Sequence, residues 1–182
     1  LAKLAEIDPG SKSGNTPRNS LITILLPWKP QHTESMENAV QALKMLYSAC
    51  PTVAWDVAIA LLPSLHGSTM PTPTPHYREY SGERSVTWAE YWEFTRTVVQ
   101  LMIEWASNDM VRWACLIEKY PDVCHSYPEA GGLISDALLN IKTEGLTDKQ
   151  KATFHDVLRE LISLHRQHLD TEWEVVPSVV EG

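Results

Sequence analysis

The sequence predicts an all-α protein built from stacked antiparallel helical pairs, an arrangement like that of helical-repeat proteins. Three observations support this prediction. Apolar residues recur at three- and four-residue steps along most of the chain, as they do on one face of a helix. Thr87 with Glu90 and Thr147 with Gln150 have the spacing of capping boxes, which open helices. Prolines and short polar turns separate the periodic stretches.

The N-terminal part contains two short apolar segments. Residues 1–7 are typical of the end of a helix, which stops at Asp8. Residues 20–26 are apolar but short. They fit either a helix whose first turn contains Pro17 or a strand, and both alternatives stay open.

The first helical pair covers residues 34–62. Thr33 is a candidate N-cap for its first helix, which runs to the residue before Pro51. Pro51 starts the second helix, which ends before Pro63. Because only a tight turn separates them, we expect the two helices to pack as an αα-hairpin.

The second pair follows a proline-rich stretch. Thr87 caps a long helix that runs to about residue 107. Asn108 and Asp109 either break the periodicity there or cap a following helix that we expect to stop at Pro121. We interpret the next segment, residues 124–132, as a loop.

The third pair is shorter. Its first helix covers residues 133–142 and is expected to end near Gly145, a candidate C-cap. Its second helix begins after Thr147 and runs to about residue 169.

The first two pairs also resemble each other at an offset of about 58 residues. If this match is real, the pairs stack as in a solenoid; the alternative is that any two amphipathic pairs share such a pattern. The matched residues are Tyr47 with Trp105, Val53 with Val111, Trp55 with Trp113, Ile59 with Ile117 and Pro63 with Pro121.

Residues 66–85 alternate proline with threonine and therefore favour an extended backbone. Neither flanking pair has enough apolar surface for a core of its own. We therefore predict a long, ordered, proline-rich connection, with Tyr77 or Tyr80 packing onto the helices, in a single domain of residues 1–182. A free linker between two domains is the alternative.

Composition limits the function. The net charge of -8 disfavours nucleic-acid binding, which requires clustered Lys and Arg. No apolar run reaches the length of a membrane span, so we expect no membrane partner. An odd number of cysteines without CxxC spacing fits a reducing cytoplasm. Because residue 1 is not Met, we expect a fragment of a longer protein.

Seven tryptophans are far more than a chain of 182 residues usually contains. They predict either helices packed on both sides or an exposed aromatic surface that meets a protein partner or other domains of the same chain. The residues expected to form an interaction surface are Trp28, Tyr77, Arg78, Tyr80, Trp88 and Trp92.

No catalytic residue, cofactor site or metal site is predicted, because none of the common nucleophile, phosphate-binding or metalloprotease motifs occurs. One alternative is a metal-dependent or histidine-based enzyme domain that uses His66, His76, His165 and His168. A homo-oligomerisation domain is another alternative.

Two segments carry a resemblance. "NSLITILLPWKPQH" at residues 19–32 and "ALLPSLHGSTMPTPTPHYREY" at residues 60–80 are similar to a helical region of large bacterial multidomain proteins. Such proteins resemble the STAND-type NTPases of bacterial defence, in which a helical sensor follows an ATPase core. The resemblance implies a non-catalytic sensor or scaffold module, and any nucleotide hydrolysis would belong to another part of the longer protein.

Overall fold

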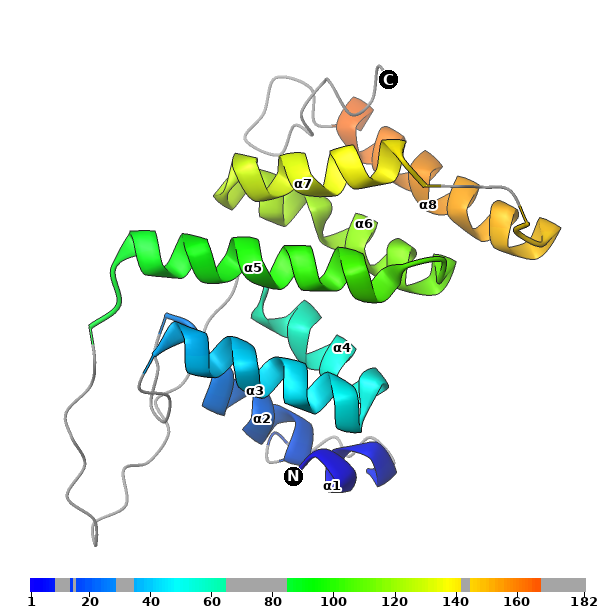
Figure 1. The fold of residues 1–182 in the computed structure, drawn as a ribbon. Helices are drawn as coiled ribbons and strands as arrows, with labels where there is room; N and C mark the ends of the chain where they lie inside the picture. Colours follow the sequence, from blue (N-terminus) through cyan, green and yellow to red (C-terminus); the bar gives the residue numbers. More distant parts are fainter. Residues whose placement is uncertain (9–13, 15, 29–34, 65–84, 142–144, 168–182) are drawn as a thin grey trace, which may run out of the picture. The chain divides into compact units, whose positions relative to one another are not determined.

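The computed structural model describes residues 1–8, 14, 16–28, 35–64, 85–141 and 145–167. These residues form eight α-helices and no strand, which confirms the all-α prediction (Figure 1). The chain divides into two compact units, residues 1–61 with 66–98 and residues 62–65 with 99–182, and each is described by itself. The helices are α1 (Ala2–Ile7), α2 (Pro17–Leu25), α3 (Met36–Ala49), α4 (Pro51–Leu61), α5 (Trp88–Ala106), α6 (Met110–Ser126), α7 (Pro128–Leu139) and α8 (Asp148–Gln167).

Helix α4 forms the centre of the first unit, where α1, α2 and α3 all pack against it. Helix α4 is apolar around most of its circumference, as expected of a helix that other elements surround. Its buried side chains are Val53, Ala54, Trp55, Val57, Ala58 and Leu61.

Residues 17–25 form helix α2. Of the two alternatives that the sequence left open for this segment, a helix and a strand, the helix is therefore correct. Thr16 caps the helix through a 3.1 Å hydrogen bond that its hydroxyl accepts from the Asn19 amide, and Pro17 occupies the first turn. Arg18 forms a 2.9 Å ion pair with Asp56, which joins α2 to α4.

Helices α3 and α4 form the predicted hairpin. Ser35 caps α3 by accepting a 3.2 Å hydrogen bond from the Asn38 amide, so the prediction of Thr33 as the cap is wrong. Ser35 is the residue directly before the first helical position, where a side-chain oxygen reaches the free amides of the first turn.

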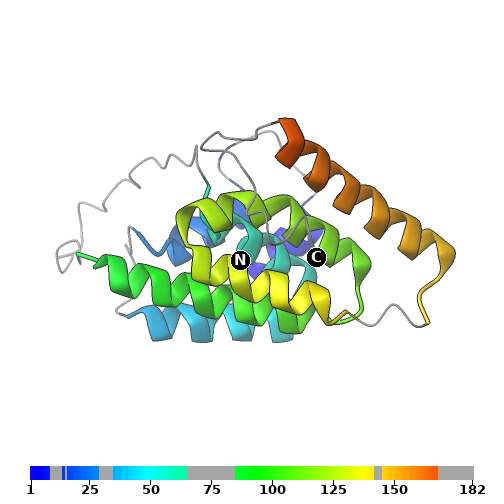
Figure 2. The ribbon, with the colours of Figure 1, turned by 90° about the horizontal axis from the view of Figure 1, so that it is seen from above.

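Helix α6 is the centre of the second unit (Figures 1 and 2). Helices α7 and α8, which we expected to pair with each other, both pack on α6. Tyr120 and Cys124 contact α7, whereas Ile117 and Pro121 face α8. Different side chains of α6 therefore pack against α7 and against α8.

Pro121 does not end α6, contrary to the prediction, because the helix continues to Ser126. A proline inside a helix leaves the carbonyl four residues earlier without its amide donor. Burial of the residues around it offsets this cost, since Tyr120, Val123 and Cys124 are at most 6% exposed.

The segment expected to be a loop at residues 124–132 is therefore mostly helical. Its first residues complete α6, and α7 begins at Pro128, where a proline is favoured at the first helical position. Helix α7 ends at Leu139 with Asn140 as its C-cap, so Gly145 does not cap it. Gly145 instead has a φ of 86°, in the left-handed region that glycine tolerates.

The internal repeat fails at two of its matched positions. Val53 is 1% exposed, whereas Val111 is 67% exposed. Pro63 lies beyond the end of α4, whereas Pro121 lies inside α6. Only a shared amphipathic pattern therefore remains, as in the buried pair Trp55 and Trp113.

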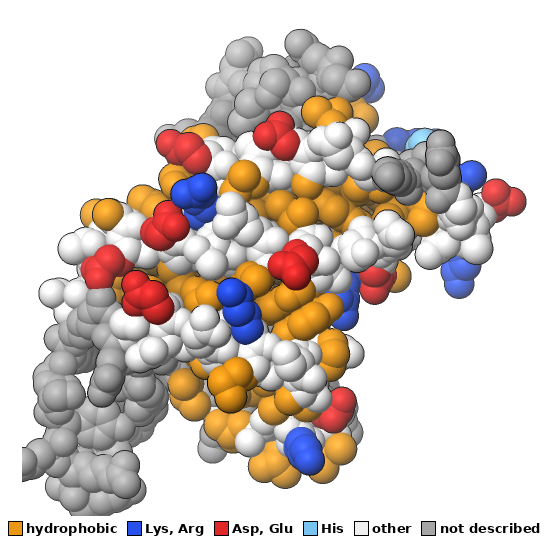
Figure 3. Space-filling view, viewed as in Figure 1, with side chains coloured by type: hydrophobic (Ala, Val, Ile, Leu, Met, Phe, Trp, Pro, Cys, Tyr) orange, Lys and Arg blue, Asp and Glu red, His pale blue; other side chains and the backbone are white. Residues whose placement is uncertain are grey.

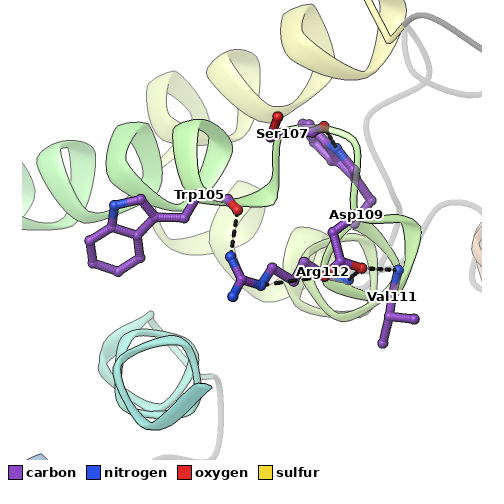
Figure 4. Close-up of polar contacts among 6 residues, drawn as sticks. Trp105, Ser107, Asp109, Val111 and Arg112 are labelled. Carbon is purple, nitrogen blue, oxygen red and sulfur yellow. Dashed lines mark hydrogen bonds and ion pairs between the residues drawn. The ribbon is translucent and has the colours of Figure 1, made fainter. Parts of the chain in front are cut away.

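The turn from α5 to α6 is held by side chains of α6 and its N-cap, two of which donate to backbone carbonyls at the end of α5 and in the turn (Figure 4). Asp109 caps α6, one of the two alternatives that the sequence left open, and Ser107 has a φ of 43°. Arg112 donates a 2.6 Å hydrogen bond to the carbonyl of Trp105, in the last turn of α5, where carbonyls lack helical donors. Trp113 donates a 2.9 Å hydrogen bond from its indole nitrogen to the carbonyl of Ser107.

The predicted proline-rich connection lies almost wholly outside the described residues, and the single domain stays a prediction. No described helix combines the length and the apolar character that crossing a bilayer requires.

Candidate interaction surface

Four aromatic side chains of the first unit contact one another, and we call them the aromatic cluster: Trp28, Trp88, Tyr91 and Trp92. Trp88 and Trp92 stack with ring centroids 5.6 Å apart and planes inclined by 22°. Tyr91 lies 4.4 Å from Trp92, 6.0 Å from Trp88 and 6.2 Å from Trp28, measured between ring centroids. Tyr91 is therefore the residue that joins the other three rings.

Helix α5 supplies three of these rings from its first two turns. Residues three and four positions apart share one helix face, so Trp88 reaches both Tyr91 and Trp92. The capping box fixes where this face begins: Glu90 accepts a 3.0 Å hydrogen bond from the Thr87 amide, and the Thr87 hydroxyl accepts one of 3.3 Å from the Glu90 amide.

Trp28 joins the cluster from a different part of the chain. It follows α2 by three residues, and the intervening Leu26 is only 4% exposed. Burial of Leu26 anchors the backbone next to Trp28, whose ring meets Tyr91 edge to face. This geometry is favoured because the positive edge of one ring faces the negative face of the other.

Exposure rises outward through the cluster. Tyr91 is 9% exposed, Trp92 is intermediate, Trp28 is 41% exposed and Trp88 is 74% exposed. Burial raises the pKa of the Tyr91 phenol above its ordinary value. The cluster therefore rests on a buried, uncharged ring and presents tryptophan surface to solvent.

The stacking distance limits what the cluster can bind. Two rings at 5.6 Å leave no space for a group between them, so the cluster is a platform rather than a cage around a cation. None of the three indole rings is nucleophilic or strongly basic, and the Tyr91 side chain is buried. A partner would bind here through apolar contact with the ring faces and hydrogen bonds to the indole N–H groups.

Three of the residues predicted for an interaction surface are thus brought together: Trp28, Trp88 and Trp92. The other three, Tyr77, Arg78 and Tyr80, lie outside the described residues. Tyr91 was not among the residues predicted for this surface, although its spacing of three residues from Trp88 is a signal in the sequence that places both rings on one helix face.

The remaining aromatic residues of α5 serve the core. Phe94 and Trp105 are 2% and 7% exposed. Helix α5 therefore carries both buried aromatic side chains and the exposed Trp88, and whether the exposed part meets a partner stays a prediction.

Other exposed apolar side chains lie along α1 and at single positions of α3, α6, α7 and α8. Leu1, Leu4 and Ile7 are more than half exposed, and hydrophobic side chains reach the surface over α1 in Figure 3. Single exposed aliphatic residues are common on soluble proteins. The aromatic cluster differs from them because its rings hold one another in place.

The residues of the histidine-based enzyme alternative lie mostly outside the described part of the chain. His66, His76 and His168 are not among the described residues, and the placement of the His165 side chain is not described either. Among the residues that are described, no three His, Cys, Asp or Glu side chains lie close enough together to hold a metal ion.

Comparison with protein-family models, with curated proteins and with solved structures found no match. The class that the described residues define is an all-α protein with a partly exposed aromatic cluster at the start of α5.

Proposed function

We propose that this chain is a non-catalytic protein-interaction module, acting as a sensor or scaffold in a larger bacterial cytoplasmic protein. The observation that carries the proposal is the exposure of Trp88, which is 74% accessible while its ring stacks on Trp92. Tryptophan and tyrosine are the residues that most often anchor protein interfaces.

The energetics of the cluster support a binding role. Ordering a side chain on association costs roughly 0.5–1.5 kcal/mol. The contacts of Trp88 with Tyr91 and Trp92 already restrict its ring in the unbound protein, so less of this cost remains for the complex. Covering an aromatic ring also removes a large apolar area from water.

A photo-crosslinking experiment tests the proposal. Ala89 is exposed in the first turn of α5, and a benzoylphenylalanine at this position places the reactive group beside the cluster. We expect irradiation of producing cells to give one discrete adduct, with a partner protein or another region of the longer chain. Trp88→Ala should weaken binding by about tenfold or more, as expected for an interface anchor.

The matched control is the same crosslinker at Leu139, which is 73% exposed on α7. If both positions give the same set of adducts, or if Ala89 gives none, the proposed surface is wrong. An adduct with a second copy of the chain would instead support the homo-oligomerisation alternative, and light-scattering molar mass would verify it.

The resemblance to the helical sensor of STAND-like defence NTPases supports the sensor form of this proposal. The enzyme alternative has its own test in the longer protein. Single alanine substitutions of His66, His76, His165 and His168 should leave its activity nearly unchanged, and loss of activity to the level of a dead enzyme would favour the alternative.

A further inference from the structure

Helices α6 and α8 enclose a groove of about 250 Å³ in the second unit. Its floor is apolar and consists of Ile117, Pro121, Val157, Leu161 and Leu164. Two carboxylates, Glu118 from α6 and Glu160 from α8, complete its lining.

Helix α8 packs on α6 but leaves part of its apolar side exposed. Among the described side chains of α8, only Leu161 is buried, at 6% exposure. Leu164 is still 37% exposed, although it lies on the apolar side of the helix. Exposed apolar surface of this kind is stabilised when another element covers it.

Among the described residues, no cation pairs with the carboxylates of the groove. Glu118 and Glu160 are both exposed, and neither forms an ion pair with a described residue. The basic residues that directly follow or precede them are engaged elsewhere. Lys119 pairs with Asp122 at 3.5 Å, and Arg159 pairs with Asp156 at 3.9 Å. The groove therefore combines an apolar floor with uncompensated negative charge on both of its helices.

The volume argues for an apolar side chain as the occupant. Pockets for small organic ligands typically measure about 300–1,000 Å³. A groove of about 250 Å³ between two helices instead accepts one or two large side chains. Partner helices bind such grooves by inserting apolar residues spaced three and four positions apart.

We propose that this groove binds a basic amphipathic helix of a partner protein. Leucine-like residues of that helix cover Leu161 and Leu164, and Lys or Arg residues beside them pair with Glu118 and Glu160. The charges select a basic helix over an acidic one, since like charges on facing surfaces repel. This site is distinct from the aromatic cluster and does not depend on the function proposed for it.

The test uses three synthetic helical peptides of 18 residues with leucines at i, i+3, i+4 and i+7 and with only Lys, only Gln or only Glu elsewhere. Fluorescein anisotropy measures their binding to the whole chain. We expect the Lys peptide to bind about tenfold or more tightly than the Glu peptide, and binding to weaken when salt is raised.

Charge-matched variants locate the site. Glu118→Gln with Glu160→Gln should weaken binding of the Lys peptide by about fivefold, the loss expected for two partly exposed ion pairs. Glu104→Gln with Asp136→Asn removes the same charge from exposed positions of the same unit that do not line the groove. This control should change binding by less than about twofold.

A substitution in the apolar floor of the groove distinguishes the contribution of apolar contact to peptide binding from the contribution of charge. Leu164→Ser changes a partly exposed residue, so the fold should tolerate it, and circular dichroism verifies that it does. It should weaken all three peptides to a similar extent, because each of them presents the same leucines.

Three results would overturn the proposal. The first is that the Lys peptide fails to bind. The second is that the groove variant and the control variant weaken binding of the Lys peptide equally, which would indicate attraction to the net charge of the chain alone. The third is a solution molar mass of a dimer that Leu164→Ser converts to a monomer, which assigns the groove to a second copy of the chain.

Discussion

Gly131 of α7 lies directly against Cys124 of α6, so closely that a Cβ atom at position 131 would be 3.2 Å from the Cα atom of Cys124 and even closer to its sulfur. The two helices can approach each other only because residue 131 has no side chain. The same contact includes a 2.9 Å hydrogen bond between the hydroxyls of Tyr120 and Ser135. Helix α7 is therefore held to α6 by close packing and by a polar link.

Gly131→Ala should lower the free energy of unfolding by about 1–3 kcal/mol, because the added methyl group overpacks the contact with the α6 backbone. Urea denaturation measures this change. Gly132→Ala is the matched control, since its Cβ would meet nothing within 4 Å. It should stabilise by up to about 1 kcal/mol through helix propensity. A stabilising effect of Gly131→Ala would contradict the close approach of the two helices.

Pro121→Ala should raise the free energy of unfolding by about 1–3 kcal/mol, because it restores an amide donor inside α6. The matched control is Pro128→Ala at the start of α7, where the amide of the new alanine would have no acceptor within the helix. Thermal or urea unfolding of both variants gives the comparison. Equal changes in the two would mean that α6 has adapted fully to Pro121.

Thr147→Ala should lower the free energy of unfolding by about 1 kcal/mol, since it removes the N-cap of α8. The Thr147 hydroxyl accepts a 3.3 Å hydrogen bond from the Gln150 amide, and Gln150 accepts one of 3.0 Å from the Thr147 amide. Thr153→Ala, inside the same helix, should change stability by less than about 0.5 kcal/mol. Urea denaturation of both variants tests whether the capping box, rather than threonine content, stabilises α8.

Stability should fall above pH 9 partly through Cys124. Burial raises the pKa of its thiol from 9.0 to about 11. The unfolded chain, whose thiol ionises at its ordinary pKa, therefore loses its proton first as the pH rises, and unfolding becomes more favourable between pH 9 and pH 11. Below pH 9 the thiol is protonated in both states and contributes no slope.

Urea denaturation from pH 8 to pH 11 measures this effect against Cys124→Ala, which lacks the ionising group. The native chain should lose more stability over this range than the variant. Burial also raises the pKa of Tyr120 and Tyr91, so the variant should keep part of the slope. Identical slopes would show that Cys124 has the same pKa in the folded and unfolded states.

Local sequence determined the helices and most of their starts. Thr87 and Thr147 cap helices as predicted, and Asp109 caps one as the sequence allowed, because a cap acts through hydrogen bonds to residues only two or three positions away. The spacing of Trp88 and Trp92 likewise placed their rings together, since helix geometry alone brings such residues onto one face.

Tertiary structure decided the features that depend on contacts between residues far apart in the sequence. Residues 17–25 became a helix in contact with α4, a neighbour that local apolar pattern does not reveal. Helix α6 passed through Pro121 because α7 packs against Tyr120 before it and Cys124 after it, and this burial outweighs a lost hydrogen bond. Trp28 reached Tyr91, some sixty residues later in the chain, only through the packing of the first unit. The groove between α6 and α8 has the same origin, since its carboxylates come from helices whose approach no local interaction specifies.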